Sequence, residues 1–189
     1  MKKLLVYVFV LTLLLFGCGG EKPPYGVGIE SGTGYFTFQG NISSIHFPEA
    51  LQYFSSHSIK KVVIEIHSLG CSLFEVWRIV SLMELYSDNI KYETRVYGIA
   101  ASGGLVIFIA WDKRLVSKRA SFMWHNLPGH MSKEDNKFFD DGVNRYIAIR
   151  SGVPLEQIEG KIREDGNQKD WYFGAKEAIS LGIAHGYIE

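Results

Sequence analysis

The chain has 189 residues, with 20 basic and 20 acidic side chains, and its formal net charge is therefore zero. Hydrophobic residues make up 47% of the chain and aromatic residues 14%, which supports one packed core and excludes a disordered protein. The lack of a basic excess argues against a nucleic-acid binder, and two cysteines are too few for a disulfide scaffold.

A short apolar segment follows two lysines at the start of the chain. Residues 4–16, after Lys2 and Lys3, contain only one clearly polar side chain, that of Thr12. A helix needs roughly 20 residues to cross the hydrocarbon core of a bilayer, so this segment is too short to span it. A positive start followed by an apolar run of this length is typical of a secretory signal. An uncleaved membrane anchor and a signal peptide cut elsewhere remain as alternatives.

The apolar segment ends in four residues that resemble the lipobox of bacterial lipoproteins, Leu15-Phe16-Gly17-Cys18. In that motif the cysteine is acylated and becomes the new N-terminus. We therefore predict a lipoprotein signal peptide at residues 1–17 and lipidation of Cys18. The acyl chains would anchor an exported protein to a membrane, facing the periplasm or the cell exterior of a bacterium.

The residues after Cys18 have a different composition from the rest of the chain. Six glycines and the pair Pro23-Pro24 lie between residues 19 and 34, with few apolar side chains among them. This composition predicts a Gly/Pro-rich tether over residues 18–34, with no secondary structure of its own. If Cys18 carries lipid, Cys71 is the only remaining thiol, and no intramolecular disulfide can form.

Residues 35–189 alternate between strand-like and helix-like patterns. In chain order we predict a strand at 35–39, a helix at 48–57, a strand at 61–66, a helix at 72–86, a strand at 91–99, a helix at 103–110, strands at 113–117 and 121–124, and helices at 132–150, 154–162 and 174–181. Ser132 and Asp135 form a capping signal for the longest helix. The inward residues of that helix are predicted to be Phe139, Val143, Tyr146 and Ile147.

Strand–helix alternation, repeated three times, argues for an α/β domain with a mainly parallel sheet. In such sheets the chemistry concentrates at the carboxyl ends of the strands. The first segment at the carboxyl end of a predicted strand is residues 98–104. There the strand is followed by small residues, Ser102 and two glycines, and then by an apolar helix. This segment is one residue away from the G-x-S-x-G nucleophile elbow. The alternative is that Ser102 only caps the helix.

The second segment is residues 66–72, where another buried strand enters a helix. Backbone N–H groups of a turn at Gly70 and Cys71 could face an oxyanion, which acyl transfer requires. The alternative is a glycine-containing turn with Ser72 as the helix N-cap. Cys71, with His67 nearby in sequence, is a second candidate nucleophile, although a lone cysteine is more often inert packing.

The third segment is residues 122–126, where His125 ends a short apolar strand. A general base for a serine is presented at this kind of strand end and is oriented by a third group. The alternative is a histidine that is satisfied in the core. The six histidines show no spacing typical of metal ligands, and we predict neither a metal site nor a cofactor.

Taken in this order, the three segments resemble the Clp protease proteolytic subunit and its relatives. The family's Ser-Pro-Gly-Gly oxyanion turn, its Ala-Ser-Met-Gly nucleophile turn and its Met-Ile-His-Gln segment match residues 68–71, 101–104 and 123–126. Residues 152–159 resemble the family's helix after the handle, and Asp170 with the residues after it fits the stretch opened by the family's catalytic aspartate. The resemblance covers about residues 35–189.

The resemblance implies an α/β fold built as a Clp/crotonase-like spiral of βαβ units with a long handle helix. It also implies a serine endopeptidase that acts on peptides or unfolded proteins through the triad Ser102, His125 and Asp170. The oxyanion hole would be formed at Gly70, Cys71 and Gly103. The handle implies a homo-oligomer, whereas export to a place without ATP argues against a partner ATPase.

Several features of the sequence leave alternatives open. About five extra residues precede Asp170, and Asp165 competes with it for the acidic role. Cys71 stands where the family has glycine, and Leu69 stands where it has proline. If position 71 required positive φ, the oxyanion hole would be misshapen, and the protein would be a non-catalytic lipoprotein that serves as a binding or assembly module.

Two further hypotheses assume the same fold but a different reaction. The first is a Ser–Lys dyad, as in the related signal-peptide peptidases, with Lys113 or Lys118 as the base. The second is action on an acyl-thioester, as in crotonase relatives. Export away from the coenzyme A pool argues against the hypothesis of a thioester substrate.

Overall fold

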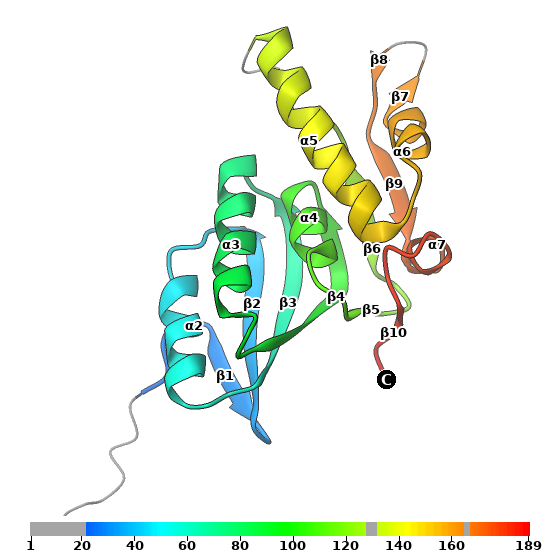
Figure 1. The fold of residues 1–189 in the computed structure, drawn as a ribbon. Coiled ribbons are helices and arrows are strands. Elements are labelled where there is room, and N and C mark those ends of the chain that lie inside the picture. Colours follow the sequence, from blue (N-terminus) through cyan, green and yellow to red (C-terminus); the bar gives the residue numbers. More distant parts are fainter. Residues whose placement is uncertain (1–21, 128–131, 165–166) are drawn as a thin grey trace, which may run out of the picture.

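A computed structural model describes residues 22–127, 132–164 and 167–189 (Figure 1). The predicted signal peptide, Cys18 and Asp165 lie outside these ranges. Within them, no helix has both the length and the apolar character needed to cross a membrane.

A sheet in the order β1-β2-β3-β4-β5-β10 forms the centre of the domain, with β6 and β9 attached through β4. Strands β2, β3, β4 and β5 run parallel to one another, whereas β1 is an antiparallel edge strand on β2. The bounds are β1 (Val27–Glu30), β2 (Thr33–Asn41), β3 (Lys61–Gly70), β4 (Lys91–Ala101), β5 (Arg114–Val116), β6 (Ser121–Trp124), β9 (Trp171–Gly174) and β10 (Gly186–Tyr187), with a separate ribbon of β7 (Arg163–Glu164) and β8 (Asn167–Gln168).

The helices follow the predicted pattern to within about two residues at each end. They are α2 (Phe47–Ser56), α3 (Leu73–Tyr86), α4 (Gly103–Ile109), α5 (Lys133–Ser151), α6 (Leu155–Lys161) and α7 (Ala175–Ser180). The predicted cap of the longest helix is confirmed, because Ser132 Oγ accepts a hydrogen bond from the Asp135 N–H at 3.1 Å. Figure 1 shows α5 rising beyond the sheet as the longest helix.

The prediction that residues 18–34 carry no secondary structure is wrong from Val27 onward. Strand β1 pairs along its length with β2, and the connecting residues Ser31 and Gly32 have φ angles of 48° and 76°. Two consecutive positive φ angles are what a tight two-residue hairpin turn requires. Of the described glycines that suggested a tether, Gly32 serves this turn and Gly34 allows close packing against Phe54.

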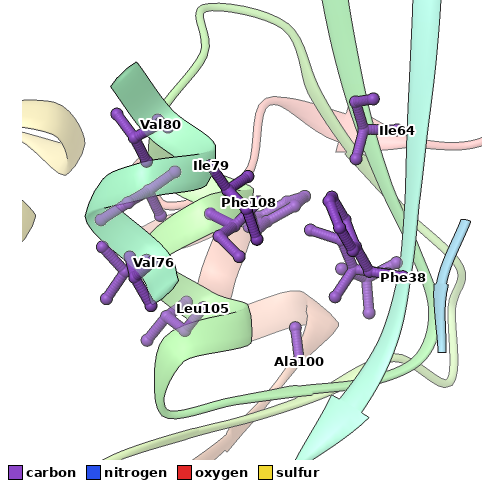
Figure 2. Packing of buried hydrophobic residues seen from close by; sticks show 14 of the residues in the cluster. Phe38, Ile64, Val76, Ile79, Val80, Ala100, Leu105 and Phe108 are labelled. Carbon is purple, nitrogen blue, oxygen red and sulfur yellow. The ribbon is translucent and has the colours of Figure 1, made fainter. Parts of the chain in front are cut away.

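One hydrophobic core fills the space between the sheet and the helices that cover it. Figure 2 shows Ile79 of α3 and Phe108 of α4 on the side that faces Phe38, and the same buried cluster includes Val76, Val80, Leu105 and Ile64. All of these side chains are buried. Burial of this kind is the main free-energy gain of folding, and here it fixes α3 and α4 where each follows a strand.

Strand β4 changes its neighbour part of the way along its length. Residues 94–96 pair with β5, whereas Ile99, Ala100 and Ala101 pair with β6. On the other side, Ile66 pairs with Val96 but Ser68 pairs with Ala100, so residues 97–99 bulge opposite a single residue of β3. The carboxyl ends of β4 and β6 consequently lie side by side.

Gly34 tests whether β1 and β2 pack as part of this core. A Cβ at Gly34 would lie 2.5 Å from Cε1 of the buried Phe54, whereas a Cβ at Gly28 would meet nothing closer than 3.6 Å. We expect Gly34→Ala to lower the free energy of unfolding by about 1–3 kcal/mol, and Gly28→Ala to lower it much less. Urea unfolding measures both variants, and equal midpoints would contradict the packing.

Candidate active site

Ser102 lies in the turn between β4 and α4, with φ 51° and ψ −122°. This backbone conformation is strained for any residue other than glycine. Two backbone contacts hold the turn in place. The Ser102 N–H donates to the Met123 carbonyl at 2.8 Å, and the Ser102 carbonyl accepts from the Leu105 N–H at 3.0 Å. The first contact attaches the turn to β6, and the second begins α4.

His125 follows β6 directly, and its Nε2 atom lies 3.0 Å from Ser102 Oγ. Both side chains are half-buried. The contact suits a histidine with Nδ1 protonated, whose Nε2 can accept the serine proton. The structure thus brings together two of the residues that the sequence singled out.

The turn after β3 lies against the Ser102 turn. Gly70 has φ 116°, and a Cβ at this position would lie 2.8 Å from Ser102 Cβ and 3.1 Å from Gly103 N. Only glycine satisfies both the backbone angle and the lack of space. The buried Ser68 side chain holds this turn, because its Oγ accepts from the Gly70 N–H at 2.9 Å and donates to the Gly40 carbonyl.

Cys71 occupies an ordinary backbone conformation. Among the described residues other than glycine, positive φ occurs only at Ser31, Ser58 and Ser102. The positive φ angle of this turn occurs at Gly70, which adopts it readily. The cysteine at position 71, where the family has glycine, is therefore not strained. A Cβ on Gly103 would lie 3.1 Å from Cys71 N, which places the backbone amides of residues 71 and 103 close together beside Ser102.

The Cys71 thiol does not suit nucleophilic catalysis. Burial, with a smaller contribution from the Glu75 charge, raises the pKa of Cys71 to about 12. The thiol is therefore protonated at neutral pH, whereas a cysteine nucleophile must be a thiolate. His67 does not activate it either, because His67 Nδ1 accepts a hydrogen bond of 3.4 Å from the Ile99 N–H instead.

Asp170, the predicted third member of the triad, is exposed, and its carboxylate accepts a hydrogen bond of 3.3 Å from the Tyr172 hydroxyl. Within residues 22–127, 132–164 and 167–189, no hydrogen bond or ion pair joins Asp170 to His125. The structure therefore brings Ser102 and His125 into contact and leaves Asp170 outside that contact.

Lys113 is engaged far from the serine. Its Nζ lies 2.7 Å from the carboxylate of Glu93, which also pairs with Lys61 and Arg95. Glu93 is near the start of β4, and at about 3.3 Å per residue the strand carries Ser102 up to roughly 30 Å away from it. Lys113 is thereby excluded as the base of a Ser–Lys dyad in this arrangement.

Asp140 of α5 is a residue near the site that the sequence analysis missed. Its Oδ1 accepts a hydrogen bond of 2.7 Å from the Leu127 N–H, and the residue is 7% exposed. Burial raises the pKa of Asp140, and the charge of His125 is among the groups that oppose this rise. Asp140 lies three and seven residues before Val143 and Ile147, so helical periodicity places its acidic side chain on the same buried face of the helix. An acidic residue at such a position is a signal that the sequence offered.

A cavity of about 910 Å³ opens beside Ser102 and His125. Most of its lining is apolar, with contributions from Leu69, Leu73, Phe74, Ile99, Leu127 and Phe139. Such a cavity suits a hydrophobic side chain of a ligand that is bound next to Ser102. In the described ranges, no three His, Cys, Asp or Glu side chains gather as a metal site would require.

An α/β domain with a serine in a strained strand-to-helix turn, a histidine at hydrogen-bonding distance and two neighbouring backbone amides has the features of a serine hydrolase. The sequence model of the Clp protease family matches residues 43–189. The chain therefore belongs to the Clp protease family, a family of serine peptidases.

The fold is similar to that of a solved structure, a mutant of ClpP1 from Listeria monocytogenes. The TM-score is 0.73 at 22% sequence identity, over 82% of this chain and 91% of that one. At this level of identity the likeness shows the fold. The predicted Clp-like α/β fold is thus confirmed.

Substitution of Gly70 tests whether the two turns form one site. We expect Gly70→Ala to reduce the rate of covalent labelling of Ser102 by an active-site probe about 100-fold, because the new Cβ displaces the Ser102 turn and the Gly103 amide. Gly104→Ala is the matched control, since a Cβ there meets nothing closer than 3.6 Å. Equal labelling rates in the two folded variants would contradict the assignment.

Proposed function

We propose that this protein is an exported, lipid-anchored serine endopeptidase that hydrolyses peptides or unfolded proteins without ATP. The observation that supports it most directly is the 3.0 Å contact between His125 Nε2 and Ser102 Oγ, in a chain of the Clp protease family. Homologues in this family form homo-oligomers and act on peptide substrates.

In the first half of the reaction Ser102 Oγ attacks the carbonyl carbon of the peptide bond. His125 Nε2 takes the hydroxyl proton, so a tetrahedral intermediate with a negative oxygen forms beside an imidazolium. The carbon–nitrogen bond then breaks as His125 returns the proton to the leaving amine. The product is an acyl group esterified to Ser102 and a free amine.

In the second half water takes the place of the amine. His125 removes a proton from the water as it attacks the ester carbon, and the same proton then goes to Ser102 Oγ as the ester breaks. The backbone amides of Cys71 and Gly103 are the proposed oxyanion hole in both halves, and Gly70 provides the space in front of them. No cofactor takes part in this sequence.

Asp170 remains the third member of the triad that the family resemblance proposes. In the described conformation its carboxylate accepts the Tyr172 hydroxyl hydrogen bond. Asp170 would therefore act on His125 only after its side chain leaves Tyr172. Its exposure makes such a rearrangement inexpensive, because neither the carboxylate nor the hydroxyl would be left buried without a partner.

The non-catalytic alternative was motivated by Cys71 in the oxyanion turn. The positive φ angle lies at Gly70, and Ser102 is in contact with His125, so these two observations do not favour it, although Asp170 stands outside the contact. The proposed homo-oligomer would use α5, on which the large apolar side chains of Phe138 and Ile149 are 74% and 80% exposed.

Labelling with a fluorophosphonate probe tests the proposed activity. We expect the wild type to be labelled, Ser102→Ala to lose labelling completely, and His125→Gln to lose it by at least about 100-fold because the hydroxyl lacks its base. Ser180→Ala, which changes an exposed serine of α7, should be labelled like the wild type. A wild type that is not labelled, or a labelled Ser102→Ala variant, would refute the serine mechanism.

Membrane attachment is a separate proposal with its own test. In bacteria fed an alkyne-bearing fatty acid, we expect the wild type to incorporate the label and to sediment with membranes. Cys18→Ser should lose the label, because the acylated atom would be its sulfur. Cys71→Ser should keep it. A Cys18→Ser variant that still carries the fatty acid would show that the anchor is misassigned.

A further inference from the structure

We propose that Asp140 is a positioning residue for His125, which acts from the buried face of α5. Its carboxylate holds the backbone beside the histidine and stabilises the imidazolium that forms during acyl transfer. The inference rests on the proposed function in one respect, since it takes His125 as the general base.

The geometry begins with the backbone just after the histidine. Asp140 Oδ1 accepts the Leu127 N–H at 2.7 Å, two residues beyond His125. The acceptor comes from α5, the next element after β6 in the chain, and only 7% of Asp140 is exposed. A short hydrogen bond to a buried carboxylate restrains the backbone more firmly than a contact with water could.

The next turn of α5 extends the same restraint to the other side of His125. Asn144 Oδ1 accepts from Trp124 Nε1 at 2.8 Å, and Asn144 Nδ2 donates to Asn126 Oδ1 at 3.0 Å. Asn126 and Asn144 are both buried. The buried face of α5 therefore binds the residues that flank His125 in sequence and leaves the imidazole free to face Ser102.

Restraint of the backbone alone does not explain why the acceptor is a carboxylate. An asparagine could accept the Leu127 N–H equally well without the cost of burying a charge. Besides burial, the groups that act on Asp140 are the like charge of Asp141 on the same helix, Arg163 of β7 and His125. Of these, only His125 gains a positive charge during the proposed reaction.

Asp140 and Asp170 differ in how effectively they can act on His125. The Asp170 carboxylate is exposed, so water and salt screen its charge, and its hydrogen bond goes to Tyr172. Asp140 is buried, where the same charge acts through a medium of lower dielectric constant. In the described conformation Asp140 is therefore the carboxylate better placed to stabilise an imidazolium at His125.

The test is the titration of the His125 imidazole, followed by NMR in the full-length protein. Asp140→Asn keeps an acceptor for the Leu127 N–H and removes the charge. A carboxylate stabilises the charged form of a neighbouring histidine, so its loss should make the imidazolium easier to deprotonate. The acid limb of the fluorophosphonate labelling profile should therefore move to lower pH by about half to one unit, and the maximal rate should fall about three- to tenfold.

Three further variants separate positioning from general effects. Asp140→Glu restores the charge and should recover part of the shift. Asp141→Asn removes the neighbouring carboxylate, which is more exposed and pairs with Lys137, and should leave the His125 titration within about 0.2 units of the wild type. Asp170→Asn should likewise move the His125 titration less than Asp140→Asn does.

An Asp140→Asn variant that folds and titrates like the wild type would overturn the inference. If that variant does not fold, the wild type still decides the matter, because the carboxyl resonance of Asp140 must shift as His125 titrates. A resonance that does not respond would refute the coupling. Failure of the proposed function looks different, since the wild type would then escape labelling while the His125 titration remained measurable.

Discussion

The bulge of β4 at residues 97–99 is the feature on which the site depends. Before it, β4 pairs with β5, and after it, Ala101 pairs with Met123 of β6. Ser102 and His125 follow two parallel strands that end side by side, and they therefore meet. The imidazole of His67 lies against the bulge, where a Cβ at Gly98 would be 2.4 Å from its Nδ1. A glycine at position 98 thus leaves room for that ring beside the bulge.

The turns at Gly70 and Ser102, beside the cavity, both depend on backbone angles with positive φ. Ser102 adopts a strained angle that projects its hydroxyl, and contacts with Met123 and α4 maintain it. Gly70 adopts an angle that costs glycine little and brings the next amide close to Ser102. With the steric requirement met by Gly70, Cys71 can replace glycine without strain, and its raised pKa keeps the thiol from competing with the serine hydroxyl.

Sequence patterns were sufficient for most elements and placed Ser102 and His125 at strand ends, where parallel strands bring residues together. The pairing of the two as catalytic groups came from the family resemblance. Sequence patterns failed at β1, since the glycine content that suggests a tether is also what a tight hairpin against Phe54 needs. They also failed at Asp140, whose partner at Leu127 is joined to it only by tertiary packing. The rotamer of Asp170, which selects Tyr172, is likewise absent from any local pattern.

Among the residues that the structure describes, the two buried carboxylates, Glu93 and Asp140, have opposite electrostatic roles. Although burial opposes ionisation, hydrogen bonds from Lys113, Arg95 and Lys61 lower the pKa of Glu93 to about 2. That cluster stabilises the fold above the ordinary glutamate pKa, and its contribution is lost as the pH falls towards 2. Asp140 has a raised pKa instead, so its ionised form destabilises the fold at neutral pH. A structural role would favour the neutral amide, whereas a role beside a histidine that becomes charged accounts for the acid.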